Sequence, residues 1–337
     1  MDFFLHNASS IFDLRPTDQV YVGNIPYVVK RLARGGMGFV LLLAQNTEIS
    51  LDRFSAFGLR LAVKTVLPDV ADEEGIRLFR RELTVWAGFR HPNIVSLLSI
   101  LDSEDAGWIA AMDWCQGSLR DIMDNLNLIP LKEATDILGD ILSGLDYAYK
   151  TDHVVHLDLK PENILYDADV TRMMRKGTPE LDSIRKSRFL VSDWGLASIK
   201  QIELNKIAGL PLSSETAANT FNNMGTILYM APERFKRGTT STLASDMFSL
   251  GMIYVEMLTG ALPIRQGIHP VESIVTGLYL KDCISLLQKY RIPKSIQHTI
   301  LSMLAYDPHQ RPRSYAELKD LIIRAYRASL NPLRRLF

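Results

Sequence analysis

The stretch that decides the fold is HLDLKPENIL at positions 156–165, followed by SDWG at positions 192–195. Asp158 and Asn163 lie five residues apart in the first segment, with Lys160 between them, and Asp193 adds a second acid from the next segment. Carboxylate and amide oxygens suit Mg²⁺, and a lysine ammonium suits phosphate. An aspartate followed five residues later by an asparagine is common in ordinary loops, so that pair alone carries little weight.

The complete set meets the demands of phosphoryl transfer. The transferred group spreads negative charge over its oxygens, so a protein must supply cations, metal-holding ligands and a carboxylate that orients the attacking hydroxyl. Asp158 fits the role of that carboxylate, and Lys160 reaches the same phosphate. We therefore predict Asp158, Lys160 and Asn163 as catalytic residues, and Asn163 and Asp193 as ligands of Mg²⁺.

A glycine-rich turn lies upstream. Residues 32–40 read LARGGMGFV and separate two apolar runs, 27–32 and 39–44, so the pattern predicts a hairpin. Glycines in such a turn let backbone N–H groups approach a phosphate closely, although a glycine-rich hairpin is more often only a turn. The nucleotide-binding candidates in this segment are Leu32, Ala33, Arg34, Gly35, Gly36, Met37, Gly38, Phe39 and Val40.

A lysine and a glutamate follow on the next two predicted elements. Lys64 ends the apolar, strand-like run 61–64, which also contains Ala62. Apolar residues spaced by three and four over 74–89 predict an amphipathic helix that carries Glu82. On charge pattern alone, Lys64 would be a solvated strand end and Glu82 a surface residue.

Taken in order, these motifs resemble those of a protein kinase. Further matches are GTILYMAPE at 225–233, DMFSLG at 246–251 and HQRP at 309–312. The resemblance covers residues 27 to about 326 and looks like the serine/threonine branch, with bacterial-type features. It implies that Lys64 grips the α- and β-phosphates of ATP and pairs with Glu82. It also implies a bidentate pair between Arg311 and Glu233.

The same resemblance locates the hinge between two lobes. The strand-like run 108–112 precedes DWCQGSL at 113–119. Backbone groups of Asp113 and Cys115 would bind adenine, Met112 would close the back of the pocket, and Leu165 joins the nucleotide-binding set. On composition alone these are buried strand residues followed by a turn.

The expected fold is α+β with two lobes, a small antiparallel-sheet N-lobe with one main helix and a larger helical C-lobe. A length of 337 residues suits about two domains, and 47% hydrophobic residues can fill their cores. The expected boundaries are an N-terminal extension at 1–22, an ATP-binding N-lobe at 23–113, a catalytic and substrate-binding C-lobe at 114–326 and a basic tail at 327–337. Apolar positions over 131–150 predict a long buried helix of the C-lobe.

Composition limits the partners. A net charge of zero gives no indication of nucleic acid or an anionic membrane, and no apolar run reaches the roughly 18 residues of a membrane span. The N-terminus lacks a basic signal-peptide start, so we expect a cytoplasmic protein. Its two cysteines, Cys115 and Cys283, form no disulfide framework or zinc motif. The expected cofactors are ATP and Mg²⁺, and the expected partner is a protein substrate with a serine or threonine acceptor.

Departures from the kinase pattern suggest how the chain is regulated. Leu157 stands where many kinases have an arginine that binds a phosphorylated activation loop, so activity should not require a phosphate there. Trp194 replaces the usual phenylalanine, and the resemblance stacks it in a column with Trp86, Leu97 and His156. The activation loop carries candidate autophosphorylation sites at Ser213, Ser214, Thr216, Thr220 and Thr226. Segments 46–59 and 167–187 are longer than usual and are interpreted as surface insertions.

Two other functions fit the same motifs. One is a pseudokinase, a nucleotide-binding scaffold that commonly lacks at least one of the five residues Lys64, Glu82, Asp158, Asn163 and Asp193, all of which are present here. The other is a small-molecule phosphotransferase, which would share the catalytic aspartate and asparagine but would not need the segment 231–233.

Overall fold

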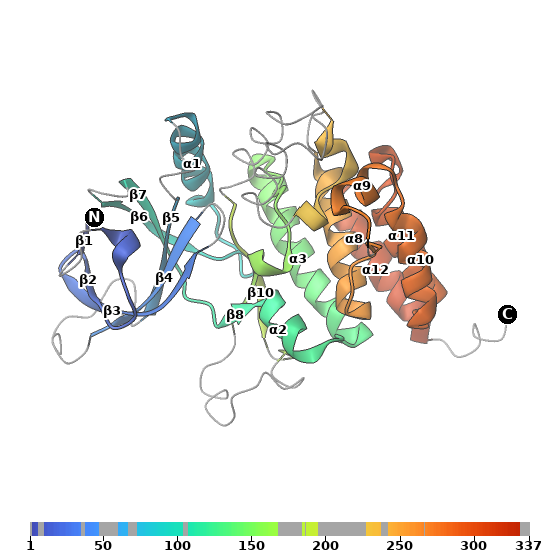
Figure 1. Ribbon diagram of the computed structural model, residues 1–337, viewed down its shortest axis with the longest axis horizontal. Coiled ribbons are helices and arrows are strands. Elements are labelled where there is room, and N and C mark those ends of the chain that lie inside the picture. Colours follow the sequence, from blue (N-terminus) through green and yellow to red (C-terminus); the bar gives the residue numbers. More distant parts are fainter. Residues whose placement is uncertain are drawn as a thin grey trace.

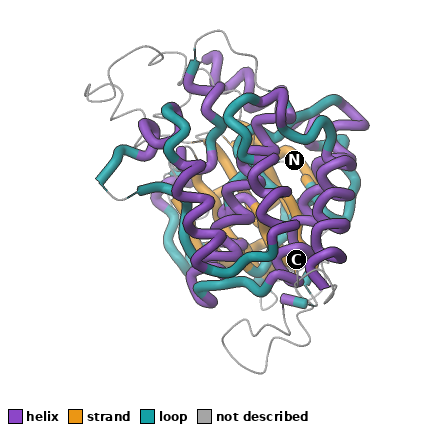
Figure 2. Tube along the Cα trace, turned by 90° about the vertical axis from the view of Figure 1, so that its right-hand side faces the viewer, coloured by secondary structure: helices purple, strands orange, loops and turns teal. Residues whose placement is uncertain are grey.

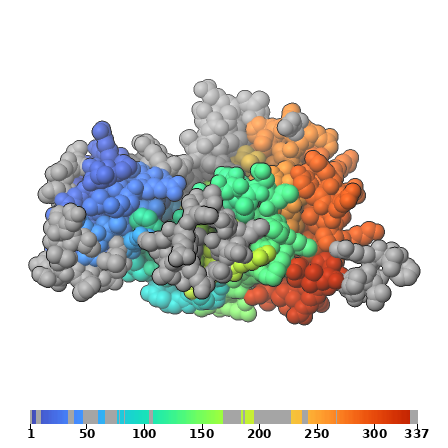
Figure 3. Space-filling view, turned by 90° about the horizontal axis from the view of Figure 1, so that it is seen from below, coloured from blue at the N-terminus to red at the C-terminus, as the bar shows by residue number. Residues whose placement is uncertain are grey.

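The computed structural model describes residues 2–5, 10–34, 38–46, 60–66, 73–103, 107–167, 184–185, 187–194, 227–236, 242–265 and 267–330. Figure 1 shows two lobes side by side, one built on a sheet with a single helix and the other almost entirely helical. From below, the N-lobe is blue and the C-lobe runs from green to red (Figure 3). The expected α+β class with two lobes is confirmed.

An antiparallel sheet of seven strands forms the N-lobe, in the order β1-β2-β3-β4-β5-β7-β6. The strands are β1 (Phe3–Leu5), β2 (Gln19–Val22), β3 (Ile25–Arg34), β4 (Gly38–Gln45), β5 (Arg60–Val66), β6 (Leu97–Ser103) and β7 (Gly107–Met112). Cross-strand pairs from Tyr27 with Gln45 to Arg34 with Phe39 confirm the predicted hairpin. Side chains alternate between the two faces of these strands, so one face packs into a core while the other faces the second lobe.

The N-terminal segment completes this sheet. The sequence placed residues 1–22 in a separate extension, but β1 and β2 lie within it and extend the sheet. A parallel bridge between Asp2 and Asp102 then brings the β1 edge against β6. Phe3 and Ile11 are buried in the same core as Tyr27 and other apolar residues of the sheet. The first strands therefore cover an apolar face that would otherwise meet water.

The N-lobe helix α1 (Glu73–Trp86) matches the helix predicted from apolar spacing. Phe79, Leu83 and Trp86 are the buried residues on its inner face. The chain after α1 runs along β10 (Arg188–Val191) of the C-lobe. There Asn93 donates its side-chain amide to the carbonyl of Phe189 at 2.9 Å, and Ile94 bridges Val191. This attachment connects the helix to the strand that leads into Asp193.

The C-lobe packs its helices around α8 (Leu243–Thr259), which is buried from Ser245 to Thr259. The other helices are α2 (Leu119–Leu126), α3 (Leu131–Asp152), α9 (Pro270–Val275), α10 (Tyr279–Lys289), α11 (Lys294–Met303) and α12 (Tyr315–Leu330). Figure 2 shows these helices in purple in front of the orange strands. The long helix predicted over 131–150 is α3. No helix in the described part of the chain is both long and apolar enough to cross a membrane.

Short elements carry the loops of the C-lobe. A three-stranded sheet joins β8 (Gly117–Ser118), β9 (Ile164–Asp167) and β10 (Arg188–Val191) in the order β10-β9-β8. The short 3-10 helices are η1 (Ile11–Asp13) in the N-lobe, and η3 (Pro161–Asn163), η4 (Ile227–Tyr229), η5 (Pro232–Phe235) and η6 (Pro308–Gln310) in the C-lobe. Most of the two expected insertions lies outside the described residues, although Ile184 is buried and Arg185 pairs with Glu133 at 2.6 Å.

Candidate active site

A cleft of about 280 Å³ lies between the two lobes. Its lining residues from the N-lobe sheet are Arg31, Ala33, Val40, Leu42, Ala62, Lys64 and Met112, and those from the following segment and the C-lobe are Asp113, Cys115, Gln116, Gly117, Ser118, Asp121, Glu162, Leu165, Ser192 and Asp193. Apolar side chains and several polar or charged groups share this lining, a mixture that a small-molecule site can use for packing and for orientation. Segments far apart in the sequence thus meet in one cavity.

Two predicted nucleotide contacts lie away from this cleft. Phe39 is 6% exposed and belongs to the N-lobe core, and Leu32 packs against the same core. Successive side chains of a strand point to opposite faces, so only their neighbours Ala33 and Val40 face the cleft. The side chains of Leu32 and Phe39 therefore do not line the cleft, and a nucleotide contact through their backbone stays a prediction. Alternation instead adds Arg31 and Leu42, which the sequence interpretation missed although each lies two residues from an assigned one.

The remaining members of the glycine-rich segment cannot be placed. Gly35, Gly36 and Met37 lie outside the described residues, as does the side chain of Arg34, and Gly38 has no side chain to place. The activation-loop hydroxyls from Ser213 to Thr226 also lie outside them.

Lys64 and Asp193 form a charged pair inside the cleft. The Lys64 ammonium lies 2.6 Å from Asp193 Oδ1, and the Lys64 side chain is 7% exposed. Burial alone would raise the pKa of Asp193, but the charges of Lys64 and Lys160 outweigh it and lower that pKa. Asp193 therefore keeps its negative charge at neutral pH. The predicted partner Glu82 lies on α1, but its side chain is outside the described residues.

Asp158 and Asn163 are buried and hydrogen-bonded to each other. The Asn163 side-chain amide donates to Asp158 Oδ2 at 2.9 Å and to the Asp158 carbonyl at 2.8 Å. Pro161 opens the 3-10 turn η3, which brings the asparagine back over the aspartate. Lys160 precedes this turn and is close enough to act on the pKa of Asp193. The charges of Lys160 and Asp158 on this loop both act on Asp193, which lines the cleft.

Asp246, at the start of α8, holds the backbone just before Asp158. Its Oδ2 accepts from the amide of His156 at 2.9 Å and its Oδ1 from the amide of Leu157 at 2.7 Å. The Tyr315 hydroxyl also donates to Oδ2, at 2.8 Å. Burial raises the pKa of Asp246, opposed by these donors. Because both backbone donors bind one rigid helix, the catalytic loop is fixed to the centre of the C-lobe.

Aromatic rings support the segment that carries Asp193. The Trp194 ring lies 5.0 Å from that of His156 and 5.1 Å from that of Phe89, in edge contacts. His156 Nε2 is also 2.7 Å from the carbonyl of Ser192. The predicted contact between Trp194 and His156 is confirmed. Trp86 donates its indole N–H to the Val95 carbonyl at 2.8 Å and belongs to the same core.

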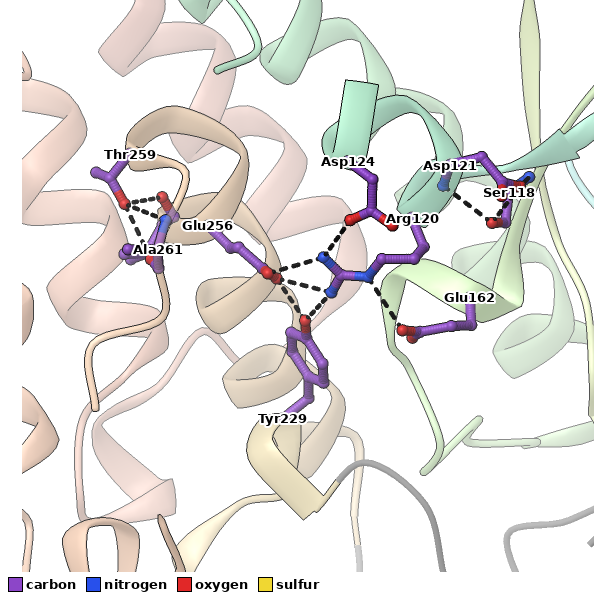
Figure 4. Close-up of polar contacts among 10 residues, drawn as sticks. Ser118, Arg120, Asp121, Asp124, Glu162, Tyr229, Glu256, Thr259 and Ala261 are labelled. Carbon is purple, nitrogen blue, oxygen red and sulfur yellow. Dashed lines mark hydrogen bonds and ion pairs between the residues drawn. The ribbon is translucent and has the colours of Figure 1, made fainter. Parts of the chain in front are cut away.

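Charged side chains fix the segment that follows the activation loop. Arg311 binds Glu233 through two contacts of 2.8 and 2.9 Å, which confirms the predicted bidentate pair. A second cluster centres on Arg120 of α2, which donates to Glu162 at 3.1 Å and to Glu256 at 3.0 Å (Figure 4). The Tyr229 hydroxyl donates to Glu256 and accepts from Arg120. This second cluster ties η4 to the catalytic loop.

The comparisons with known proteins agree with this geometry. The family described as protein kinase domain matches residues 45–321, most of the chain. This chain belongs to the protein kinase family. The match spans both lobes and includes Lys64, the catalytic loop, Asp193 and the Glu233–Arg311 pair.

Similar kinases come from bacteria. The chain is 29% identical over 303 residues to the serine/threonine-protein kinase PrkC of Bacillus subtilis, which covers 89% of this chain and 40% of that protein. It is also 29% identical over 296 residues to PknB of Mycobacterium leprae, covering 86% of this chain and 42% of that protein. The chain therefore spans less than half the length of these relatives.

A solved structure shows the same fold. The crystal structure of Rad53 residues 1–466 in complex with AMP-PNP superposes with a TM-score of 0.62 at 21% identity, covering 92% of this chain and 75% of that chain.

Proposed function

We propose that this kinase domain transfers the γ-phosphoryl group of ATP to serine or threonine hydroxyls of proteins, its own included. The observation that carries the proposal is the Lys64–Asp193 pair inside the cleft, together with Asp158, which is hydrogen-bonded to Asn163 and close enough to act on the pKa of Asp193. The names of the similar bacterial proteins support the serine/threonine class. Because the substrates are ATP and other proteins, the proposal includes a cytoplasmic location.

ATP would lie with its base against the apolar part of the cleft. Ala62, Met112 and Leu165 supply apolar walls there, and the backbone of Asp113 and Cys115 supplies polar groups for adenine. Lys64 would bind the α- and β-phosphates, because a buried ammonium at the polar end of the cleft is the cation nearest to Asp193 in the described structure.

The residues fit a magnesium ion. Asn163 donates its side-chain amide hydrogens to Asp158. The side-chain oxygen Oδ1 of Asn163 is then the atom that would bind a cation. Asp193 contributes a carboxylate whose pKa is lowered, and oxygen ligands of this kind are those that Mg²⁺ prefers. When bound, Mg²⁺ would neutralise charge on the phosphate oxygens.

The transfer step then needs little more from the chain. Asp158 orients the substrate hydroxyl and accepts its proton as the hydroxyl oxygen bonds to phosphorus and the bond from phosphorus to ADP breaks. Lys160 would offset charge on the transferred group. Pseudokinases commonly lack at least one of five residues, and this chain has all of them, which favours an active enzyme. They are Lys64, Glu82, Asp158, Asn163 and Asp193. The Glu233–Arg311 pair anchors a segment that a small-molecule phosphotransferase would not need.

A transfer assay tests the proposal. The purified chain is incubated with radiolabelled ATP, Mg²⁺ and casein or myelin basic protein, and the labelled amino acid is identified after hydrolysis. We expect phosphoserine or phosphothreonine, no transfer in the presence of EDTA, and a loss of at least about 100-fold in Asp158→Asn. Lys132→Met, on an exposed surface of α3, is the matched control and should keep the parental rate.

Two outcomes would overturn the proposal. Binding of ATP without transfer to any protein would indicate a pseudokinase. Transfer that persists at the parental rate in Asp158→Asn would remove Asp158 from the chemistry.

A further inference from the structure

Arg234 is a buried cation beside the catalytic loop to which the sequence interpretation gave no role. It lies in η5, directly after Glu233, and is only 3% exposed. Arginine stays protonated in proteins, so a full positive charge is buried here. Such a charge is expensive unless acids and hydrogen-bond acceptors compensate it.

The compensating groups belong to the catalytic machinery. Arg234 Nη1 donates to the carbonyl of Leu157, the residue directly before Asp158. Burial lowers the pKa of Arg234, while the carboxylates of Asp158, Asp246 and Glu233 act in the opposite direction. The guanidinium therefore lies within the electrostatic reach of the proposed catalytic carboxylate.

The position that Arg234 holds is a strained one. Leu157 has φ of 60°, in the left-handed region. A side chain with a Cβ is crowded against the following carbonyl oxygen in this region, so residues other than glycine rarely adopt it. Its amide donates to Asp246 on α8, and its carbonyl accepts from Arg234 on η5. The backbone amide and carbonyl of Leu157 are thus bound by two separate elements. This fixes the backbone direction from Leu157 into Asp158.

A neighbouring ion pair fixes Arg234 in turn. Glu233, the preceding residue, binds Arg311 through both of its carboxylate oxygens and also accepts from Ser245 at 2.9 Å. These bonds attach η5 to α8 and to the residue after η6. The backbone position from which the Arg234 side chain extends is therefore fixed. Leu157 itself carries no charge that could act on Asp158.

We propose that Arg234 is a positioning residue for Asp158. It binds the Leu157 carbonyl from the end of the activation segment and places a buried positive charge beside the catalytic loop. The inference rests on the proposed kinase function, because it gives Asp158 the catalytic role. Order at the end of the activation segment is thereby coupled to the geometry of the catalytic carboxylate.

Steady-state kinetics of three variants test the proposal. Arg234→Gln keeps a hydrogen-bond donor but removes the charge, Arg234→Lys keeps the charge, and Arg265→Gln removes a surface arginine that pairs with Asp282. We expect kcat to fall about 100-fold in Arg234→Gln with KM for ATP changed less than about twofold, since only the transition state loses an interaction. Arg234→Lys should recover at least about tenfold of this loss, and Arg265→Gln should match the parent.

Hydrogen exchange provides a readout that does not need activity. The amides of His156 and Leu157 should exchange at least about tenfold faster in Arg234→Gln than in the parent, while those of α12 stay unchanged. If the parent transfers no phosphate, the proposed function fails, and the exchange rates alone decide the positioning role. An unchanged exchange rate, a kcat within about threefold of the parent, or an equal loss in the lysine and glutamine variants would each overturn the proposal.

Discussion

Replacing Arg311 with methionine should destabilise the C-lobe more than the loss of any exposed charge. The Arg311 side chain is fully buried, and its guanidinium makes two contacts of 2.8 and 2.9 Å with Glu233. It also donates from Nε to the Ala305 carbonyl at 2.8 Å and from Nη1 to the Ala244 carbonyl at 2.8 Å. Its guanidinium carbon also lies 5.1 Å from the centre of the Phe248 ring, a cation–π contact. Methionine keeps an apolar side chain at this buried position but removes the charge and all of these contacts.

The magnitude follows from what the substitution leaves behind. Glu233 is 7% exposed, so without Arg311 a buried carboxylate loses its main counter-charge. Breaking a buried pair from one side costs about 3–5 kcal/mol. For a unit of this size, about 1 kcal/mol corresponds to about 2–4 °C, so Tm should fall by roughly 6–20 °C. Adding Glu233→Gln to Arg311→Met removes the stranded charge and should restore part of that loss.

Thermal and urea unfolding followed by circular dichroism measure both effects. Lys132→Met breaks the exposed pair with Asp136, whose partners are 58% and 62% exposed, and should leave the transition unchanged. A loss in Arg311→Met of less than about 1 kcal/mol would contradict the reasoning, because that value belongs to surface pairs. So would a double variant that is less stable than Arg311→Met alone.

Three further outcomes are expected. Phe3→Ala should lower the free energy of N-lobe unfolding by about 3–5 kcal/mol, because the ring is buried in the sheet core. Phe4→Ala, 49% exposed on the same strand, is its control, and equal urea midpoints for the two would show that β1 is not packed. Asp193 has a lowered pKa, so its contribution to stability is present above its unfolded pKa of about 3.9 and disappears as pH falls below it. Lys64→Met should lack this part of the acid destabilisation, and identical pH-dependent unfolding in parent and variant would disprove the coupling. Burial raises the pKa of Cys115 to about 12, so iodoacetamide should label it at pH 7.5 only after unfolding. Native labelling, read by mass spectrometry, would refute its burial.

Local patterns were enough to predict many elements. Two apolar runs on either side of a glycine-rich turn predicted the β3–β4 hairpin. Apolar spacing by three and four predicted α1, because side-chain direction in a helix depends only on sequence separation. The sequence assigned Asp158 and Asn163 separate chemical roles, and the structure adds that the two side chains are joined by a hydrogen bond. The order of these motifs also indicated the two-lobed fold.

Which side chains of each strand face the cleft was harder to predict from the sequence. The register of β3 shifts between Val29 and Arg31, and one extra residue in a strand reverses the faces of the residues that follow. Leu32 therefore packs into the core, and Arg31 faces the cleft. A bulge of this kind leaves no clear signal in the composition of the strand.

The sequence by itself determined which residues could do the chemistry, because motif spacing places Asp158, Asn163 and Lys160 on one loop. Only the tertiary structure decided which distant groups meet that loop. Asp193 pairs with Lys64 across the lobes, and Arg234 reaches the carbonyl of Leu157 from η5. β1 likewise joins the sheet that it closes. Such contacts depend on how whole elements pack, since burying apolar surface fixes the lobes and only then brings charges from separate segments within reach.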